Sequence, residues 1–259
     1  MNNPQKNILL DHRVTGQGPV VFFLHGFLES QVIWAPIIKE LEDCFCCVQV
    51  DFPGYGTATD QDFPEHLSEL AQKLDSLRRG LNIDSFSIVG HSMGVYVGLE
   101  WLRIAKAELQ ACIWVNGDVL SDHPKRLEER RRSISLLKRH KKAYVSMAIK
   151  GLFPPQKHEQ YGPNIIQLTQ NALGCKVHNL VNSVWAMSQR KSQREVFADF
   201  QGVKYLIAGL QDPLIPLEQI TETSRLCGAE LKTYSGGHMA WLEAPTLIIQ
   251  AINLAHHQN

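Results

Sequence analysis

A nine-residue segment in the first half of the chain reads Phe86-Ser87-Ile88-Val89-Gly90-His91-Ser92-Met93-Gly94. Its first four residues have the composition of a buried strand, and a helical pattern begins at Met93. Between them lies a G-x-S-x-G pentapeptide, which places a serine on a sharp, strained turn from strand to helix. Gly90 and Gly94 lack Cβ atoms, so the strand and the helix can approach closely. The pattern predicts that Ser92 is an exposed nucleophile rather than only a helix N-cap.

Apolar, strand-like runs alternate with helical patterns on both sides of this segment. The expected strands are Ile8–Val14, Val20–Leu24, Phe45–Val50, Phe86–Val89, Ala111–Val115, Val203–Ala208 and Glu230–Tyr234. The helical patterns between and after them are Glu29–Leu41, Pro64–Arg79, Met93–Leu109, Leu217–Leu226 and Trp241–His256. Because such alternation places helices on both faces of a mostly parallel sheet, the expected fold class is α/β.

A block without strand-like runs interrupts this alternation. It contains the helical stretches Lys125–Lys150, Asn164–Leu173 and Val177–Gln189. We therefore expect one domain, with residues 1–119 and 194–259 as its α/β core and residues 120–193 as an all-helical insertion. Between His123 and Lys142 the insertion has nine Lys or Arg and two Glu, a local balance of +7. This basic stretch is either a solvated helix face or a patch that attracts an acidic substrate or partner.

Length, charge balance and cysteine usage are those of a single-domain globular protein without metal sites. The 259 residues suit one large domain, and 26 basic residues balance 26 acidic ones, so nothing indicates a nucleic-acid or membrane-surface partner. The polar N-terminus lacks a secretory signal, and no apolar run is long enough to span a membrane. The cysteines lack zinc-type spacing and are expected to be buried, reduced thiols of a cytoplasmic monomer or homodimer. They are Cys44, Cys46, Cys47, Cys112, Cys175 and Cys227.

A serine nucleophile at neutral pH needs a general base. His238 stands in Gly236-Gly237-His238-Met239, directly after the last expected strand, and the two glycines suit a tight loop. That position agrees with the chain order serine, acid, histidine that follows this kind of turn. His256 and His257 stand in a polar tail with no strand before them. His238 is therefore the expected base.

Two aspartates compete for the role of orienting acid. Asp212 follows the Val203–Ala208 strand, and Asp118 follows the Ala111–Val115 strand. Both stand at the carboxyl end of a strand, where catalytic groups gather in open α/β sheets. The acid is expected after the penultimate strand, Val203–Ala208, which favours Asp212, with Asp118 shaping the junction into the insertion.

An anionic tetrahedral intermediate would need two hydrogen-bond donors. The backbone N–H of Met93, after the nucleophile, is one, and that of Phe27, after the Val20–Leu24 strand, is the other expected donor. His25 precedes Phe27 in the same loop. We expect its side chain to pin the loop through hydrogen bonds rather than to act as a second base.

Five segments together resemble the successive signatures of the α/β-hydrolase superfamily, and in particular its small bacterial esterase-like and C–C-hydrolase-like members. They are His25-Gly26-Phe27, Asp51-Phe52-Pro53-Gly54-Tyr55-Gly56, Gly90-His91-Ser92-Met93-Gly94, Gly209-Leu210-Gln211-Asp212-Pro213-Leu214-Ile215-Pro216 and Gly237-His238-Met239-Ala240-Trp241-Leu242-Glu243-Ala244-Pro245. The resemblance spans nearly the whole chain. It implies a sheet of the eight-stranded type, a Ser-His-Asp triad and a helical cap after the sixth strand.

The expected activity is hydrolysis of a small carboxylic ester through an acyl-enzyme, without a metal or organic cofactor. One alternative is a C–C bond hydrolase or a menaquinone-pathway-type lyase that acts on an acidic substrate. Another is a noncatalytic, ligand-binding member of the fold. Candidate substrate-binding residues in the insertion are the basic Arg126, Arg130, Arg131 and Arg132 and the apolar Met147, Leu152, Phe153 and Trp185.

Overall fold

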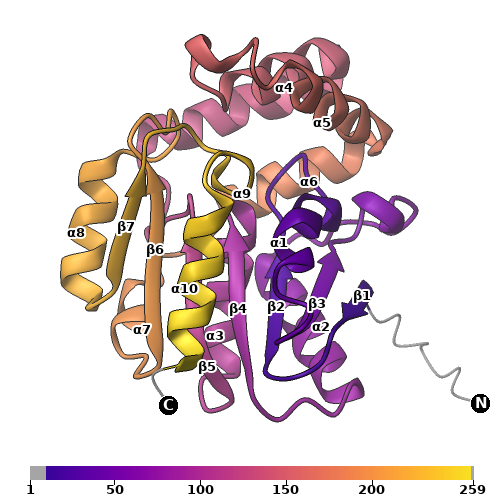
Figure 1. The fold of residues 1–259 in the computed structure, drawn as a ribbon. Helices are drawn as coiled ribbons and strands as arrows, with labels where there is room; N and C mark the ends of the chain where they lie inside the picture. The colour runs from indigo at the N-terminus through magenta and orange to yellow at the C-terminus, as the bar shows by residue number, and fades with distance from the viewer. Residues whose placement is uncertain (1–9, 258–259) are drawn as a thin grey trace, which may run out of the picture.

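The computed structural model describes residues 10–257, which form a seven-stranded sheet in the order β1-β3-β2-β4-β5-β6-β7 (Figure 1). The strands are β1 (Asp11–Thr15), β2 (Val20–Leu24), β3 (Cys46–Asp51), β4 (Phe86–His91), β5 (Leu109–Val115), β6 (Val203–Gly209) and β7 (Glu230–Tyr234). Only β1 runs antiparallel to its neighbour β3, and the other neighbouring pairs are parallel. The expected α/β class is confirmed.

The described residues contain seven strands, whereas the family resemblance implied eight. Only seven runs of the sequence have strand composition, and β1 already forms one edge of the sheet by pairing with β3. The helical insertion consequently follows the fifth strand rather than the sixth. The strand expected over Ile8–Val14 begins at Asp11, and its first two residues, Ile8 and Leu9, lie outside the described residues.

The centre of the sheet brings the ends of several strands to one edge. All six residues of β4 are buried, because this strand lies between β2 and β5 and is covered on both faces. Gly90 of β4 pairs with Leu24 of β2 and with Trp114 of β5, so these three parallel strands end at the same level. Loops that leave the carboxyl ends of these strands therefore meet above β4.

Helices cover the sheet on both faces. They are α1 (Ala35–Lys39), α2 (Leu67–Gly80), α3 (Met93–Ile104), α7 (Arg194–Ala198), α8 (Leu217–Cys227), α9 (Ala240–Glu243) and α10 (Pro245–His257), with short 3-10 turns at η1 (Gln31–Trp34) and η2 (Gly56–Ala58). In Figure 1, α10 crosses in front of the sheet and α3 lies behind it. α1 packs on α10, whereas α2 and α7 pack on α3. None of the helices within residues 10–257 is long and apolar enough to span a membrane.

The insertion consists of α4 (Pro124–Gly151), η3 (Pro155–Lys157), α5 (Gly162–Gly174) and α6 (Val177–Ser188), and it lies above the sheet in Figure 1. The long helix predicted over Lys125–Lys150 is present, but His140 has non-helical backbone angles and kinks it. The insertion is anchored to the core by buried polar contacts. The Asn179 side chain, for example, accepts a hydrogen bond from Phe63 N–H and donates one to the Gln61 carbonyl.

Several element boundaries differ from the sequence expectations. The helix expected over Met93–Leu109 ends at Ile104, because Leu109 already pairs with Phe86 as the first residue of β5. The last expected helix is divided at Ala244, because Pro245 has no N–H to continue α9. The expectation of buried thiols is wrong for Cys44, which lies in the exposed turn before β3, and Cys46 is only partly buried.

Candidate active site

Ser92 occupies a strained turn between β4 and α3. Its φ of 51° and ψ of −111° lie in a region that residues with a Cβ rarely adopt. The Ser92 N–H donates to the Val115 carbonyl of β5 at 2.9 Å, which holds the turn to the sheet. A Cβ on Gly94 would lie 2.3 Å from the Leu24 carbonyl oxygen, so only glycine allows α3 to begin this close to β2. This local geometry is what the pentapeptide predicts.

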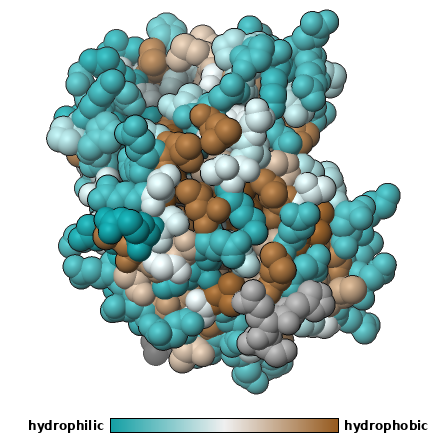
Figure 2. All heavy atoms as spheres, turned by 60° about the vertical axis from the view of Figure 1, so that its left-hand side comes forward, coloured by the Kyte–Doolittle hydropathy of each residue, from teal (hydrophilic) through white to brown (hydrophobic). Residues whose placement is uncertain are grey.

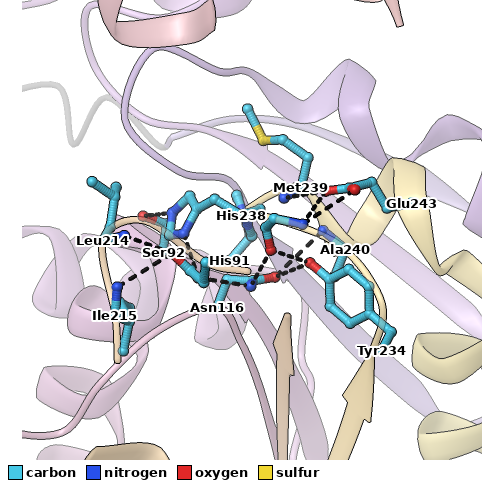
Figure 3. A network of polar contacts seen from close by, with 12 residues as sticks. His91, Ser92, Asn116, Leu214, Ile215, Tyr234, His238, Met239, Ala240 and Glu243 are labelled. Atoms are coloured by element: carbon cyan, nitrogen blue, oxygen red, sulfur yellow. Dashed lines mark hydrogen bonds and ion pairs between the residues drawn. The ribbon is translucent and has the colours of Figure 1, made fainter. Parts of the chain in front are cut away.

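His238 links Ser92 to Asp212 by two hydrogen bonds, and Figure 3 labels His238 and Ser92. Its Nε2 lies 2.9 Å from Ser92 Oγ, and its Nδ1 lies 2.8 Å from Asp212 Oδ2. The side chains of His238 and Asp212 are each only 2% exposed. The structure thus brings together three residues from three separate loops, in the order that the sequence predicts.

The Asp212 carboxylate is held as an anion by its surroundings. Burial alone would raise the pKa of Asp212, but the charge of His238 and hydrogen bonds to the carboxylate lower the pKa below its ordinary value. Oδ1 accepts the N–H groups of Leu214 and Ile215 at 2.9 and 3.2 Å. An ionised Asp212 accepts a hydrogen bond from Nδ1–H of His238. The ring proton is thereby held on Nδ1, which leaves Nε2 free to accept the Ser92 hydroxyl proton.

Asn116 is a site residue that the sequence expectations omit. Its Nδ2 donates to Asp212 Oδ2 at 2.9 Å, and its Oδ1 lies 3.2 Å from the Tyr234 hydroxyl. Tyr234 in turn donates to the Gly237 carbonyl at 2.7 Å, so the contact chain reaches the His238 loop (Figure 3). The available signal was position alone, because Asn116 is the first residue after β5.

Asp118, the rival acid, has no contact with His238. Its carboxylate accepts hydrogen bonds from Val119 N–H and from the Gln219 side chain, and the Thr223 hydroxyl lies 3.5 Å away. Burial raises the pKa of Asp118 despite these bonds. The side chain therefore connects the start of the insertion to α8, which is the junction role expected for it.

The two expected backbone donors belong to Met93, which follows Ser92 in the chain, and to Phe27, which lines the same cavity as Ser92. Within residues 10–257, neither Phe27 N–H nor Met93 N–H has a hydrogen-bond acceptor. His25 pins the Phe27 loop, since its Nδ1 donates to the Gly26 carbonyl at 2.8 Å and its Nε2 accepts Phe52 N–H at 3.1 Å. Burial lowers the pKa of His25, which agrees with a neutral, structural ring.

Two cavities meet at Ser92 and His238, under the insertion. One, of about 130 Å³, has an apolar wall formed by Tyr144, Ala148, Leu152, Val184 and Leu214. The other, of about 90 Å³, is lined by Asp118, Asp122 and Arg190, and the side chains of Arg126 and Arg130 line both cavities. Hydrophobic residues also gather in the middle of the face that Figure 2 shows. A substrate at Ser92 would therefore have one apolar and one charged surface beside it.

A buried charge cluster forms much of the polar wall. Arg130 Nε and Arg190 Nη1 both donate to the Asp122 carboxylate, and both arginine side chains are only 8% exposed. The Arg190 guanidinium also lies 4.0 Å from the centre of the Tyr96 ring. Burial opposes ionisation of Asp122, but the charges of Arg130 and Arg190 lower its pKa. Arg190 was not predicted, because nothing in the local sequence distinguishes it from a surface residue.

Other predicted substrate-binding residues lie elsewhere. Met147 and Trp185 are 62% and 47% exposed, and Phe153 is buried against the Tyr161 ring, so these three do not line either cavity. The reason is helix geometry: Tyr144, Ala148 and Leu152 recur at four-residue spacing and face inward, which turns Met147 away. Of the arginines in the basic stretch, Arg131 and Arg132 are exposed to solvent.

The chain resembles known proteins along most of its length. The profile of the Alpha/beta hydrolase family matches residues 21–251. A putative carbamate hydrolase RutD of Cronobacter turicensis is 27% identical over 238 residues, which cover 88% of this chain and 86% of that protein. Protein PHYLLO, chloroplastic, of Arabidopsis thaliana is 30% identical over 112 residues; these are 39% of this chain and only 6% of that much longer protein.

A solved structure shows the same fold. The thermophilic esterase from Thermogutta terrifontis superposes with a TM-score of 0.87 at 21% identity, and the match covers 96% of this chain and 93% of that one. The profile match, which spans more than half of the residues, establishes the relationship. The chain therefore belongs to the alpha/beta hydrolase family of enzymes.

Proposed function

We propose that this protein is a serine hydrolase that cleaves small carboxylic esters, with Ser92 as nucleophile, His238 as base and Asp212 as orienting acid. The observation that carries the proposal is the hydrogen-bonded chain from Asp212 through His238 to Ser92. A nucleophile, a base within hydrogen-bond reach and a third group that orients the base are the requirements for covalent acyl transfer. The absence of contact between Asp118 and His238 supports Asp212 as the acid.

The reaction proceeds in two steps. His238 Nε2 takes the proton of Ser92 Oγ as the oxygen attacks the ester carbonyl, and the imidazolium then gives that proton to the leaving alcohol. In the second step His238 deprotonates a water that attacks the acyl-enzyme, and the imidazolium returns the proton to Ser92 Oγ as the acid leaves. The free N–H groups of Phe27 and Met93 stabilise the oxyanion of each tetrahedral intermediate. The chemistry of these residues needs no metal or organic cofactor.

We further propose that residues 120–193 act as a cap over a core of residues 1–119 and 194–259. Support comes from the two cavities, whose walls combine residues of α4 and α6 with the Ser92 and His238 loops. Such a cap would select small molecules by the shape and charge of its lower surface. We propose a cytoplasmic enzyme that acts on such substrates.

The test is covalent labelling. A fluorophosphonate should label the wild-type protein once, at Ser92, and Ser92→Ala should abolish both labelling and hydrolysis of p-nitrophenyl esters. Ser76→Ala, which changes an exposed serine on α2, is the matched control and should behave as wild type. Full ester hydrolysis by Ser92→Ala would refute the proposal, and a wild-type protein that is neither labelled nor active would favour a noncatalytic, ligand-binding member of the fold.

A second candidate is a C–C bond hydrolase or a lyase that acts on an acidic substrate with the same three residues. Three arginines and two aspartates line the polar cavity, which leaves an excess of one positive charge if all are ionised. Burial raises the pKa of Asp118, so this carboxylate becomes neutral at a higher pH than an exposed aspartate does. When it is neutral, the net positive charge of the cavity is larger. Guanidinium groups beside Ser92 would bind a substrate carboxylate through charge-assisted hydrogen bonds.

Substrate pairs separate the two candidates. Arg130→Met should lower kcat/KM for substrates that carry a free carboxylate by about tenfold or more, which corresponds to one lost charge-assisted hydrogen bond. Neutral esters of the same size should be affected much less. Arg131→Met, at the exposed neighbouring position, is the matched control. Equal effects of Arg130→Met on charged and neutral substrates would rule out an anion-binding role for this residue.

A further inference from the structure

A carboxylate and an imidazole form a buried pair directly behind the nucleophile. Glu29 lies in the loop after β2, and His91 is the last residue of β4, immediately before Ser92. Glu29 Oε2 lies 2.8 Å from His91 Nδ1, and the two side chains are only 2% and 1% exposed. The acyl-transfer steps require neither residue, so the burial of two titratable groups at this position calls for another explanation.

The hydrogen-bond partners of the pair limit where its protons can be. Glu29 Oε2 accepts Gly26 N–H at 2.6 Å, and Oε1 accepts the Trp241 indole N–H at 3.1 Å. On the other side, His91 Nε2 lies 2.8 Å from the backbone carbonyl oxygen of His238, which can only accept. Nε2 of His91 therefore carries a proton, and a further proton lies between Nδ1 and Glu29.

The position of that further proton follows from the charges. Burial opposes ionisation of both residues, but the charge of the partner and the hydrogen bonds outweigh it: the pKa of Glu29 is lowered and the pKa of His91 is raised. His91 is then an imidazolium that donates from both ring nitrogens, to Glu29 and to the His238 carbonyl. A neutral imidazole has only one N–H and cannot make both bonds when Glu29 offers no proton.

The pair connects the three loops of the site. Glu29 holds Gly26 N–H, next to Phe27, while His91 belongs to the nucleophile turn and holds the His238 carbonyl. The backbone N–H of His238 donates a hydrogen bond of 3.0 Å to the carbonyl oxygen of Leu152, at the end of α4. A Cβ on Gly26 would lie 2.6 Å from Glu29 Oε2, so the loop packs directly on the carboxylate.

We propose that Glu29 and His91 are positioning residues of the active site. As an ion pair they keep His91 doubly protonated, and its two N–H groups hold the Phe27 loop, the Ser92 turn and the His238 loop in one arrangement. The kinetic part of this proposal rests on the proposed ester hydrolysis, whereas the protonation state of His91 does not.

Glu29→Gln is the sharpest variant, because it preserves shape and removes the charge. The amide of glutamine has one acceptor oxygen, but Gly26 N–H, Trp241 N–H and His91 all present donors to this side chain. His91 without a carboxylate partner should lose its second proton. If the glutamine amide oxygen replaces Oε2, it then faces a bare Nδ1 of His91; if the amide NH₂ replaces it, it faces Gly26 N–H. The His238 loop should then shift relative to Ser92 while the fold persists.

The first measurement is the protonation state of His91 by ¹⁵N-edited NMR of the histidine side chains, assigned by loss of the signal in His91→Asn. At pH 7.5, above the ordinary histidine pKa of about 6.5, both ring nitrogens of His91 should carry protons in the wild type and only one in Glu29→Gln. A neutral His91 in the wild-type protein would overturn the proposal. The result does not depend on any substrate.

The second measurement is ester hydrolysis well below the melting temperature of each variant. Glu29→Gln and His91→Asn should lower kcat by about 10- to 100-fold, as misplacement of reacting groups does, with KM nearly unchanged. Asp75→Asn is the matched control, because it removes a carboxylate from the buried pair with Arg78 on α2. It should lower Tm but leave kcat unchanged. Equal kcat losses in all three variants, or none in the first two, would overturn the positioning role.

Discussion

The Asp212 carboxylate accepts four hydrogen bonds, from two backbone N–H groups and from the side chains of Asn116 and His238. This full set of donors keeps a buried carboxylate ionised, which burial alone would disfavour. Asn116 contributes one donor and also touches Tyr234, so a single amide joins the acid to the loop that carries the base. The orientation of His238 is therefore supported by residues that make no contact with Ser92 in this hydrogen-bonded chain.

Asn116 provides a test of that support. Its φ of 46° is in the left-handed region, where the backbone conformation of alanine is about 1 kcal/mol less favourable than that of glycine. Asn116→Gly and Asn116→Ala both remove the amide, so both should lower kcat for ester hydrolysis by about tenfold, the equivalent of one hydrogen bond. Only the alanine variant should suffer the additional loss of stability. Urea unfolding and steady-state kinetics measure the two effects, and wild-type kcat in Asn116→Gly would show that the amide has no positioning role.

The pKa of Asp212 predicts a pH-dependent contribution to stability. Because the folded-state pKa lies below the ordinary value of about 3.9, the ionised carboxylate stabilises the fold above that pH, and this contribution is lost as the pH falls through the lowered pKa. Asp212→Asn should therefore reduce the free energy of unfolding most above about pH 5, and progressively less in stronger acid. Urea unfolding of both proteins between pH 3 and 8 tests this, and a constant difference would contradict it.

At the scale of elements, the candidate active site depends on how closely α3 begins beside the sheet. β4 ends in a buried position between β2 and β5, and the chain reverses into α3 within the strained Ser92 turn. The glycine at position 94 allows this approach because its missing side chain would point at the Leu24 carbonyl. The turn is therefore stabilised by its neighbours rather than by its own backbone preference.

Gly94→Ala should consequently lower the free energy of unfolding by about 1–3 kcal/mol, as overpacking typically does. The added methyl group should also displace Ser92 enough to slow its labelling by a fluorophosphonate. The matched control is Gly151→Ala in the last turn of α4, where a Cβ would meet nothing within 4 Å. There alanine should be neutral or slightly stabilising, because it has the higher helix propensity. Denaturant midpoints of the two variants distinguish the cases; equal midpoints would mean that the turn can relax around a methyl group.

At the scale of the whole molecule, the insertion and the core share buried polar contacts. Asn179 of α6 is completely buried and bonds the backbone of the segment around Phe63, and the Tyr55 hydroxyl donates to Ser183 at 2.7 Å. The backbone of His238 is likewise bonded to the end of α4. The insertion is thus tied to the core next to the site, and its lower surface is held over Ser92.

Asn179→Ala should therefore loosen the insertion more than the sheet. The variant leaves Phe63 N–H and the Gln61 carbonyl without partners, which should cost about 1–3 kcal/mol for each group that stays buried. Limited proteolysis should cut within residues 120–193 faster than in the wild type, whereas Asn171→Ala, an exposed change on α5, should not alter the cleavage rate. Uniform cleavage throughout the chain would indicate global unfolding instead.

Local sequence patterns determined most of the fold and indicated the candidate catalytic residues. Strand composition, helical periodicity and the glycines around Ser92 act between neighbouring residues, so the alternation of elements, the nucleophile turn and the His238 loop were predictable from the chain alone. The structure also places Asp212 rather than Asp118 in contact with His238, while Asp118 bonds the Gln219 side chain of α8.

The tertiary structure alone decided which side chains support and surround these groups. Asn116, Arg190 and the Glu29–His91 pair were not predictable, and Met147, Phe153 and Trp185 proved to lie away from the cavities. The supporting contacts join residues that are far apart in the sequence: Glu29 and His91 are separated by 62 positions, and Asn116 and Asp212 by 96. Such pairings depend on strand order and on the rotation of each helix about its axis, and short-range patterns encode neither.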